Sequence, residues 1–395
     1  MTRTAKPSLT ACHACGHTGI TPLPGLEPLG LVSSDCRPWT GAGRLAWCPA
    51  CGLLQKTVDQ DFLTDCGNIY GSYTVYHQAK GEEQQVFSPA GAACARSEHL
   101  LRQVLSRCPL PECGRLLDVG CGNGVLLKSF GALMPGWRLN GLDLDERSRE
   151  VVLALPGVED FFACDLEDAS GSFDVLSMLH CLEHVPGPAA FLGKALDRLK
   201  PGGLLLVQVP DFTANPFDLT IADHCTHFHP QGLEAVARRA GFDPLLLDQG
   251  LVAKELTLIA RKPLLPAEAP SSATAAADPR PAARQALDWL GAVLAQARSL
   301  AKGPFGIFGT SIAGAWLFGQ LGDQVRFFVD EDENRVGHDL FGKPVFRPAD
   351  APDKASVYLC LPRPIAEAIR VRLSGIGGCL VLPPTFPITQ PLESL

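Results

Sequence analysis

The sequence feature that most constrains this chain is an apolar run that ends in three alternating glycines. Residues 116–119 are typical of a buried β-strand, Gly120, Gly122 and Gly124 follow, and residues 125–133 are typical of a helix. Glycines in such a turn let the backbone approach a ligand, and the N-terminus of the next helix faces that ligand. The segment therefore predicts the strand, turn and helix that open a nucleotide-binding α/β unit.

The spacing of these glycines argues against a dinucleotide, because a G-x-G-x-x-G fingerprint needs a glycine where this chain has Val125. Acidic residues close the strands predicted next. Asp143 follows a strand over 138–142, where its carboxylate can accept both hydroxyls of a ribose. Asp165 closes a third strand, where a carboxylate can meet an adenine amine. Two further strands are predicted, over 173–178 and after the Lys-Pro-Gly-Gly turn at 200–203.

Taken in this order, the features resemble the class I S-adenosylmethionine (SAM) methyltransferases over residues 96–262. The resemblance implies a Rossmann-like α/β fold, SAM as cofactor and a methyl-transferring enzyme. An unrelated doubly wound domain is the alternative. The positions that correspond to cofactor contacts are Asp118, Gly120, Gly122, Gly124, Asp143 and Asp165.

The chain opens with two Cys-x-x-Cys pairs, Cys12 with Cys15 and Cys48 with Cys51. Each such turn directs two thiolates at one point, and four thiolates complete the tetrahedron that zinc prefers. We therefore expect a structural zinc site with no position open to water. Reduced thiols and two disulfides are the alternatives, and a cytosolic chain favours metal over disulfides. Other residues that offer substitute ligands are His13, His17 and Cys36.

With these cysteines included, the whole chain resembles the three-domain C-methyltransferases of nucleotide-linked deoxysugars. The resemblance implies that the substrate is a keto-deoxysugar carried on a nucleotide and that the methyl group goes to carbon. It also implies five segments: a zinc-binding module (1–57), a tyrosine-rich connecting segment (58–95), the SAM-binding domain (96–262), a Pro/Ala/Ser-rich linker (263–281) and a C-terminal Rossmann-like domain (282–395).

Three of the four tyrosines lie close together in the connecting segment, at Tyr70, Tyr73 and Tyr76. The resemblance implies that this segment reaches toward the sugar. It makes Tyr73 and Tyr76 substrate-binding residues and gives Tyr76 a catalytic role as well. Ordinary packing of amphipathic rings is the alternative for each tyrosine.

A histidine-rich segment, with Asp223, His224, His227 and His229, follows the fifth predicted strand. C-methylation beside a keto group needs a base that removes a proton from carbon, and an imidazole is suited to that task near neutral pH. The resemblance implies that His224 is this base, with Asp223 in the place of the family's glutamate. A structural histidine, or a metal site made by the three histidines, are the alternatives.

Two more histidines, His180 and His184, follow the fourth predicted strand and would face the methyl group of SAM. The resemblance implies a catalytic role for His184 near the oxygen of an enolate. It places His180 against the substrate, at a position where the family often has asparagine. A structural role is the alternative for both.

Residues 303–332 repeat the pattern of strand, glycine turn, helix and acidic strand end. This pattern predicts a second Rossmann-like unit, with later strands near 341–345 and 360–362. The resemblance makes residues 309–311 and Asp330 candidates for the cleft that takes the nucleotide sugar. A domain that only shapes the cleft is the alternative.

Composition excludes several classes of function. The net charge of −8, without any run of Lys or Arg, gives no footprint for nucleic acid. The apolar stretches are shorter than the roughly 20 residues of a membrane span, and the first residues form no apolar leader. We therefore expect a cytoplasmic enzyme that acts on a small molecule. The rival functions are O- or N-methylation of another small molecule and binding of SAM or a nucleotide without turnover.

Overall fold

The computed structural model describes residues 11–41, 43–72, 83, 85–87, 93–265, 278–374 and 378–386. In these ranges the strands form large sheets of four, seven and six strands and two sheets of two strands. Tyr73 and Tyr76, which the sequence assigns to the substrate, lie outside the described residues.

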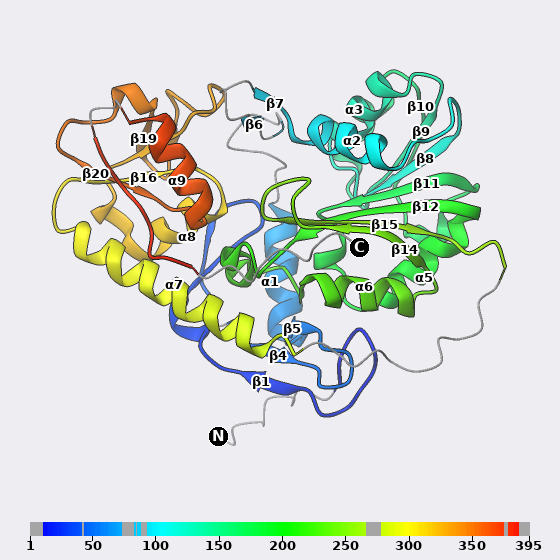
Figure 1. The fold of residues 1–395 in the computed structure, drawn as a ribbon, viewed down its shortest axis with the longest axis horizontal. Coiled ribbons are helices and arrows are strands. Elements are labelled where there is room, and N and C mark those ends of the chain that lie inside the picture. The colour runs from blue at the N-terminus through cyan, green and yellow to red at the C-terminus, as the bar shows by residue number, and fades with distance from the viewer. Residues whose placement is uncertain are drawn as a thin grey trace.

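The glycine turn follows a strand of the seven-stranded sheet (Figure 1). Its strands are β8 (Arg115–Val119), β9 (Arg138–Leu142), β10 (Val158–Phe162), β11 (Phe173–Leu179), β12 (Leu199–Pro210), β14 (Asp243–Asp248) and β15 (Glu255–Arg261). They lie in the order β10-β9-β8-β11-β12-β15-β14. The first five are parallel, and β15 and β14 are antiparallel to their neighbours.

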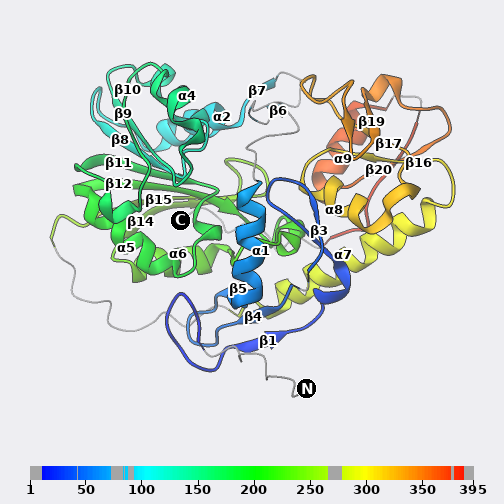
Figure 2. The same cartoon turned by 180° about the vertical axis from the view of Figure 1, so that it is seen from behind.

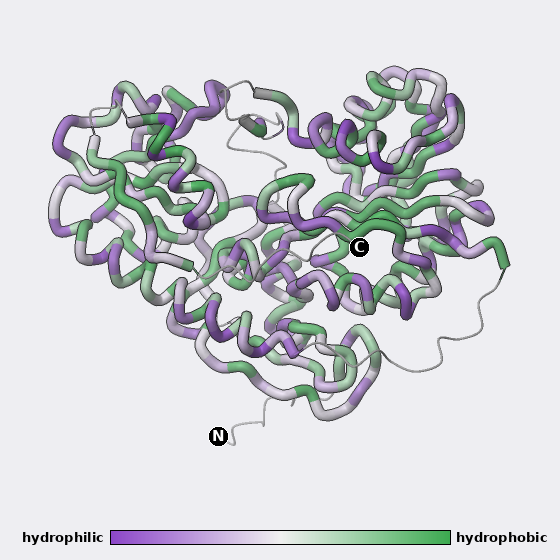
Figure 3. The backbone as a smooth tube through the Cα atoms, viewed as in Figure 1, coloured by the Kyte–Doolittle hydropathy of each residue, from purple (hydrophilic) through white to green (hydrophobic). Residues whose placement is uncertain are grey.

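Helices cover both faces of this sheet (Figure 1), and its central strands are largely hydrophobic along their length (Figure 3). Leu116 of β8 joins the apolar core under α2 and α3, whereas Leu117 joins the core under α5 and α6. The predicted Rossmann-like α/β fold is therefore confirmed. The helices of this unit are α2 (Arg96–Arg107), α3 (Val125–Leu133), α4 (Arg149–Leu153), α5 (Pro188–Arg198) and α6 (Pro230–Arg239).

The predicted helix at 125–133 and strand at 138–142 coincide with α3 and β9. The third strand differs from the prediction, because β10 ends at Phe162. Asp165 lies beyond it as the N-cap residue of a short 3-10 helix, Leu166–Asp168. The chain has therefore left the sheet before it reaches this carboxylate.

A crevice opens where the strand order reverses. The chain leads outward from β8 to β9 and β10, and then crosses to β11 and β12 on the other side of β8. In open parallel sheets ligands bind at such a reversal, outside the carboxyl ends of the strands. The ends of β8, β9 and β10 and the loops after them carry the predicted cofactor residues to this edge. The loop after β11 carries the predicted catalytic residue His184 and the predicted substrate-binding residue His180.

The cysteine-rich opening forms a four-stranded sheet with a strand from a distant part of the chain. The sheet has the order β1-β4-β5-β13, and β13 lies at Thr226–His227, beside the predicted base. Residues that the sequence assigns to two different domains therefore share one sheet. The elements of this region are β1 (Thr21–Leu23), β2 (Leu31–Val32), β3 (Pro38–Trp39), β4 (Leu45–Trp47), β5 (Leu54–Lys56), α1 (Gln60–Gly71), β6 (Gln85–Phe87) and β7 (Ala93–Ala95).

The six-stranded sheet lies in the C-terminal part. Its elements are α7 (Arg280–Leu300), β16 (Phe305–Phe308), α8 (Ile312–Leu321), β17 (Phe327–Val329), β18 (Asp339–Leu340), β19 (Lys343–Phe346), β20 (Ser356–Leu359), α9 (Arg363–Arg372) and β21 (Cys379–Val381). The prediction of a strand at 360–362 was wrong. The strand there is β20, and Pro362 is already the N-cap residue of α9.

One apolar core joins the four-stranded sheet, the six-stranded sheet and the segment that follows β12. Phe217, in the short 3-10 helix η6 (Pro216–Thr220), packs edge-on against Trp289 of α7 and Trp316 of α8, with ring centroids 5.4 and 5.5 Å apart. The indole of Trp316 donates a hydrogen bond to the carbonyl of Leu29, 2.9 Å away. In both ribbon views α1 lies between the two α/β units (Figures 1 and 2).

Among the described helices, none combines the length and the apolar character that crossing a membrane requires.

Candidate active site

The glycine turn after β8 needs glycine at two positions. Gly120 and Gly124 have φ angles of 72° and 82°, which favour glycine. A Cβ on Gly120 would lie 3.1 Å from Cβ of Cys181, and one on Gly124 would lie 2.6 Å from Leu155. The turn therefore combines left-handed backbone with close packing, and α3 begins directly behind it.

The predicted acidic residues surround this turn. Asp143 Oδ2 accepts a hydrogen bond from the backbone N–H of Gly122 at 2.9 Å, so the ribose-binding candidate lies against the glycine loop. Asp118 is buried and accepts a hydrogen bond from the hydroxyl of Ser177 at 2.8 Å. Burial, opposed by that hydrogen bond, raises the pKa of Asp118 to about 7. The arrangement places two carboxyl groups beside the glycine turn, where a polar cofactor can reach them.

The six predicted cofactor residues divide by position. Gly124 caps α3 behind the turn, and the other five line one cavity. Asp165 is exposed at the edge of that cavity. The sequence reasoning missed Leu144, which lines the cavity beside Asp143 with 74% of its surface exposed. An apolar residue directly after the ribose-binding candidate is the local signal for it, since an adenine ring needs an apolar contact as well as a carboxylate.

This cavity has a volume of about 1290 Å³ and touches all three parts of the chain. Tyr70 contributes from the N-terminal part, His224 from the histidine segment, and Ser311, Arg335 and Leu361 from the C-terminal unit. A pocket for one drug-sized ligand measures roughly 300–1,000 Å³. The space is therefore large enough for a cofactor and a second molecule.

His224 is held by a carboxylate that the sequence analysis did not consider. Its Nδ1 lies 2.7 Å from Oδ1 of Asp218, and both side chains are almost fully buried. Burial, together with the nearby charge of His184, lowers the pKa of His224 to about 4. The imidazole is therefore neutral near pH 7, with its Nδ1 proton directed at Asp218, and a neutral imidazole can accept a proton.

Asp223, the carboxylate adjacent to His224 in sequence, contacts a different histidine. Its Oδ2 lies 3.3 Å from Nδ1 of His184, and its Oδ1 accepts a hydrogen bond from the backbone of Ser34 at 2.9 Å. The hydroxyl of Tyr70 also lies 3.1 Å from that His184 nitrogen. Burial opposes the charged form of His184, but the hydrogen bond and charge of Asp223 raise its pKa to about 9.

Two carboxylate–imidazole pairs therefore meet in the cavity with opposite protonation states. The rings of His184 and His224 lie edge to face, with centroids 4.6 Å apart. Burial alone would raise the pKa values of Asp218 and Asp223, but their histidine partners hold both well below the usual range. Neighbouring groups whose pKa values are driven apart by their surroundings are the usual mark of an acid and a base.

The third predicted histidine, His180, lies at the end of β11 with a left-handed φ of 52°. Its Nδ1 is 3.2 Å from Oε1 of Glu183, and its Nε2 is 3.6 Å from Oε2 of Glu255. Burial lowers the pKa of His180 and raises those of Glu183 and Glu255, to about 8 and about 7. His180 lines the cavity, and this buried group of carboxyls around it was not predicted.

The alternative of a metal site at His224, His227 and His229 is not supported. His227 Nδ1 lies 2.7 Å from Asp218, and His229 contacts the carbonyl of Gly52 at 3.3 Å, so the three rings do not converge. Where the structure describes the chain, His224 shares a group of potential ligand atoms with Glu183 and His184 instead.

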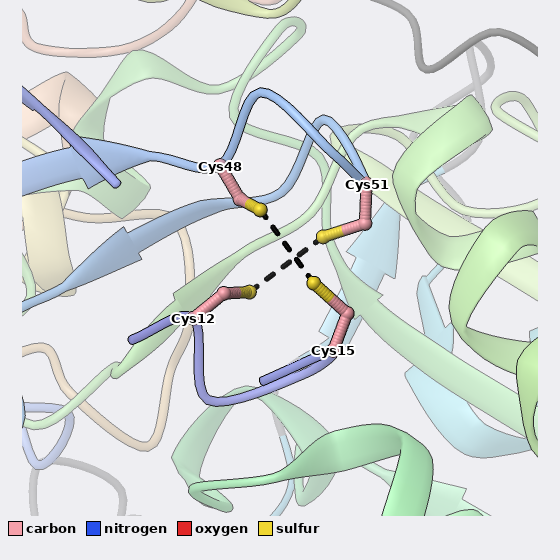
Figure 4. Close-up of side chains that lie close together, drawn as sticks. All are labelled: Cys12, Cys15, Cys48 and Cys51. Carbon is pink, nitrogen blue, oxygen red and sulfur yellow. Dashed lines mark hydrogen bonds between the residues drawn. The ribbon is translucent and has the colours of Figure 1, made fainter. Parts of the chain in front are cut away.

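The four predicted zinc ligands do converge. Sγ of Cys12 lies 3.6 Å from Sγ of Cys51, and Sγ of Cys15 lies 3.6 Å from Sγ of Cys48, along lines that cross in Figure 4. All four sulfurs lie within 4.8 Å of one another, and the cysteines are free. A tetrahedral zinc with bonds of about 2.3 Å places its sulfurs about 3.8 Å apart. The spacing therefore fits zinc.

The two cysteine turns have the same backbone design. The N–H of Gly16 donates to the carbonyl of Cys12 at 2.8 Å, and that of Gly52 donates to Cys48 at 2.8 Å. Both glycines have positive φ angles. Each turn thus bends back on itself and directs its two thiols the same way, as the Cys-x-x-Cys spacing predicts.

The second glycine turn contributes less to the cavity than its sequence indicates. Asp330 accepts hydrogen bonds from the backbone and hydroxyl of Thr310, at 3.0 and 2.6 Å, and therefore holds the turn together. Only Ser311 of the four predicted residues lines the cavity, where Arg335 joins it. Arg335 also contacts Asp330 and Asp332, so this cation is already partnered.

Comparison with known proteins identifies the family to which this chain belongs. A family model described as a methyltransferase domain matches residues 95–247. The ubiquinone biosynthesis O-methyltransferase of Ralstonia nicotianae is 31% identical over 166 residues, which cover 36% of this chain and 68% of that protein. The chain belongs to the class I SAM-dependent methyltransferases. It is an enzyme that uses SAM.

A second relative, the ubiquinone biosynthesis O-methyltransferase of Thiobacillus denitrificans, is 29% identical over 42% of this chain and 75% of its own. A putative methyltransferase from Bacillus halodurans has a solved structure with 19% identity and a TM-score of 0.34, over 41% of this chain and 98% of that chain. Each of these matches covers less than half of this methyltransferase, so the substrate is not given by them.

Proposed function

We propose that this methyltransferase transfers the methyl group of SAM to a carbon beside the keto group of a nucleotide-linked deoxysugar. The observation that carries the proposal is the contact between His224 and His184 in one cavity, each beside its own carboxylate. Their surroundings shift the pKa of His224 down and that of His184 up. C-methylation beside a carbonyl needs a base for the C–H proton and a donor for the oxygen that becomes negative. The two histidines supply one of each.

Each proton and electron pair in the proposed reaction can be followed at the protein's own residues. His224 takes the α proton, the electron pair of the C–H bond becomes the enolate, and Asp218 stabilises the imidazolium that forms. His184, held charged by Asp223, donates a hydrogen bond to the enolate oxygen. SAM, when bound, supplies the electrophilic methyl group and leaves as S-adenosylhomocysteine once the new C–C bond has formed. The protein contributes alignment and a preorganised charge pair.

The cofactor edge and the catalytic pair lie on opposite sides of the strand reversal. We assign Asp143 to the ribose hydroxyls and Asp165 to the adenine, with Asp118 and the glycine turn around the rest of SAM. The sugar and its nucleotide would occupy the part of the cavity lined by Ser311 and Arg335. His180 and the tyrosine segment would bind the sugar, although Tyr73 and Tyr76 are outside the described residues.

We further propose that Cys12, Cys15, Cys48 and Cys51 hold one structural zinc ion. The sulfur spacing supports this, and so does the matched design of the two turns. A site filled by four thiolates leaves no position for substrate. The metal would then fix the N-terminal sheet and take no part in methyl transfer.

O-methylation is the second candidate, because both curated relatives named above are O-methyltransferases. The Asp218–His224 pair could equally deprotonate a hydroxyl. One experiment separates the two: the purified enzyme is given SAM with a nucleotide-linked keto-deoxysugar, and the position of the new methyl group is read by NMR and mass spectrometry. A second arm omits SAM and follows exchange of the α hydrogen in deuterated water. A methyl group on oxygen, with no exchange, would overturn the proposal in favour of O-methylation.

A further inference from the structure

The first cysteine turn reaches directly to the strand beside the proposed base. His13 lies between Cys12 and Cys15, and its Nε2 is 2.9 Å from the hydroxyl of Thr226 in β13. The backbone N–H of His13 also donates to the side chain of Gln55, 3.3 Å away, in the neighbouring strand β5. The cysteine turn is therefore bonded to both strands at this edge of the sheet.

The second cysteine turn reaches the same segment by a different route. It leads into β5, which pairs with β13 so that Gln55 lies opposite Thr226. The backbone N–H of Lys56 donates to the carbonyl of Cys225 at 2.9 Å, one residue after His224. The ammonium of Lys56, fully buried, donates to the carbonyl of Ile221. Both turns thus hold the segment that contains His224.

From β13 the contacts continue to the base itself. His227 in β13 lies 2.7 Å from Oδ2 of Asp218, and the other oxygen of that carboxylate lies 2.7 Å from His224. All three side chains are at most 4% exposed. Asp218 and His227 are at most 1% exposed and do not line the cavity, so water does not replace a lost partner between them. A shift of β13 therefore moves the carboxylate that orients His224.

We propose that the cysteine module positions His224 through the His13–Thr226 hydrogen bond, so that both are positioning residues for methyl transfer. The inference rests on the proposed role of His224 as the base. SAM affinity should not depend on this contact, because the assigned cofactor residues lie at the ends of β8, β9 and β10. A displacement of about 1 Å can lower turnover on the order of 100-fold. The contact therefore controls kcat and leaves cofactor binding unchanged.

The test is a pair of substitutions in the full-length enzyme. Thr226→Val keeps the shape of the side chain and removes the hydroxyl. Thr226→Ser keeps the hydroxyl and removes only the methyl group. We expect Thr226→Val to lower kcat about 10-fold to 100-fold, with the dissociation constant of SAM within twofold of the unmodified enzyme. Thr226→Ser should recover most of the activity. The matched control is His17→Gln, since His17 is exposed beside the same cysteine turn.

A second readout is independent of the chemistry. Hydrogen–deuterium exchange of the backbone at residues 222–229 should rise in Thr226→Val, and also when a chelator removes the metal, whereas exchange at 116–124 should stay the same. Unchanged exchange at 222–229 together with kcat within twofold would overturn the inference. If exchange rises but His224→Ala retains activity, the contact still positions the segment and the assignment of the base fails instead.

Discussion

Asp218 accepts hydrogen bonds from two histidines at once, and the one from His224 sets the direction of the proposed base. Asp223, the carboxylate beside His224 in the sequence, instead holds His184 in its charged form. The pairing gives each imidazole a carboxylate of its own and leaves the two rings in contact with different protonation states. The pH dependence of methyl transfer follows from that difference.

Methyl transfer should depend on pH at both ends of the range. His224 has to be neutral and its pKa is about 4, so kcat/KM should fall as the pH drops toward that value. His184 has to be protonated and its pKa is about 9, so kcat/KM should fall again as the pH rises past it. Asp223→Asn removes the charge that raises the His184 pKa. The alkaline limb should therefore move to lower pH, while an unchanged alkaline limb would show that His184 is not the acid.

Removal of the base should separate catalysis from binding. His224→Ala should lose both methyl transfer and SAM-independent exchange of the sugar's α hydrogen, by about 100-fold to 10,000-fold, as is typical for a general base. Calorimetry should find SAM affinity almost unchanged. His229 is unsuitable as the control, because it is buried and contacts Gly52. The exposed His338 serves better, and His338→Ala should be silent. Activity of His224→Ala within threefold of the unmodified enzyme would direct attention to His184 as the base.

The cofactor assignment rests most directly on Asp143. Asp143→Ala removes a carboxylate that can accept charge-assisted hydrogen bonds from both ribose hydroxyls, each worth about 1.5–3 kcal/mol. SAM affinity should fall tenfold or more in a calorimetric titration. Leu144→Ala is a useful companion, since it removes only apolar contact beside the same site. Were the dissociation constant of Asp143→Ala unchanged, the ribose contact would have to be reassigned, with Asp145 the next residue to test.

Metal content provides the fourth prediction. Freshly purified protein should contain about one zinc ion per chain by elemental analysis, because four converging thiolates fill a tetrahedron. Cys48→Ser should lose that zinc and destabilise the N-terminal sheet. SAM affinity should change less than turnover, since β13 belongs to this sheet and the glycine turn does not. Protein prepared without chelators that contains no zinc would contradict the assignment.

The parts predicted best from the sequence are those that depend on near neighbours. The strand, glycine turn and helix from 115 to 133 match the structure because strand hydrophobicity, turn geometry and helix start are encoded within a few residues. The two cysteine turns were also predicted correctly, because each is determined by a few consecutive residues. Asp218 was not predicted, because it belongs to no motif and its position a few residues before the histidines was the only sign of its role. Two nearby carboxylates, at 218 and 223, carry no sequence signal that says which histidine each will meet.

The sequence by itself determined the Rossmann-like unit, its cofactor edge and the four converging cysteines, since each follows from spacing along one short stretch of chain. Only the tertiary structure decided how the catalytic segment is held. β13 joins the cysteine sheet, Phe217 packs against Trp289 and Trp316, and the buried Asp223 pairs with His184. These contacts join residues far apart in the chain. They form because burying the apolar core shared by the four-stranded sheet, the six-stranded sheet and the segment after β12 brings those segments together. Burial also sets the pKa values of His184 and His224 apart. A buried imidazolium loses its stabilisation by water, so the nearest carboxylate and the neighbouring charges decide whether the ring is protonated.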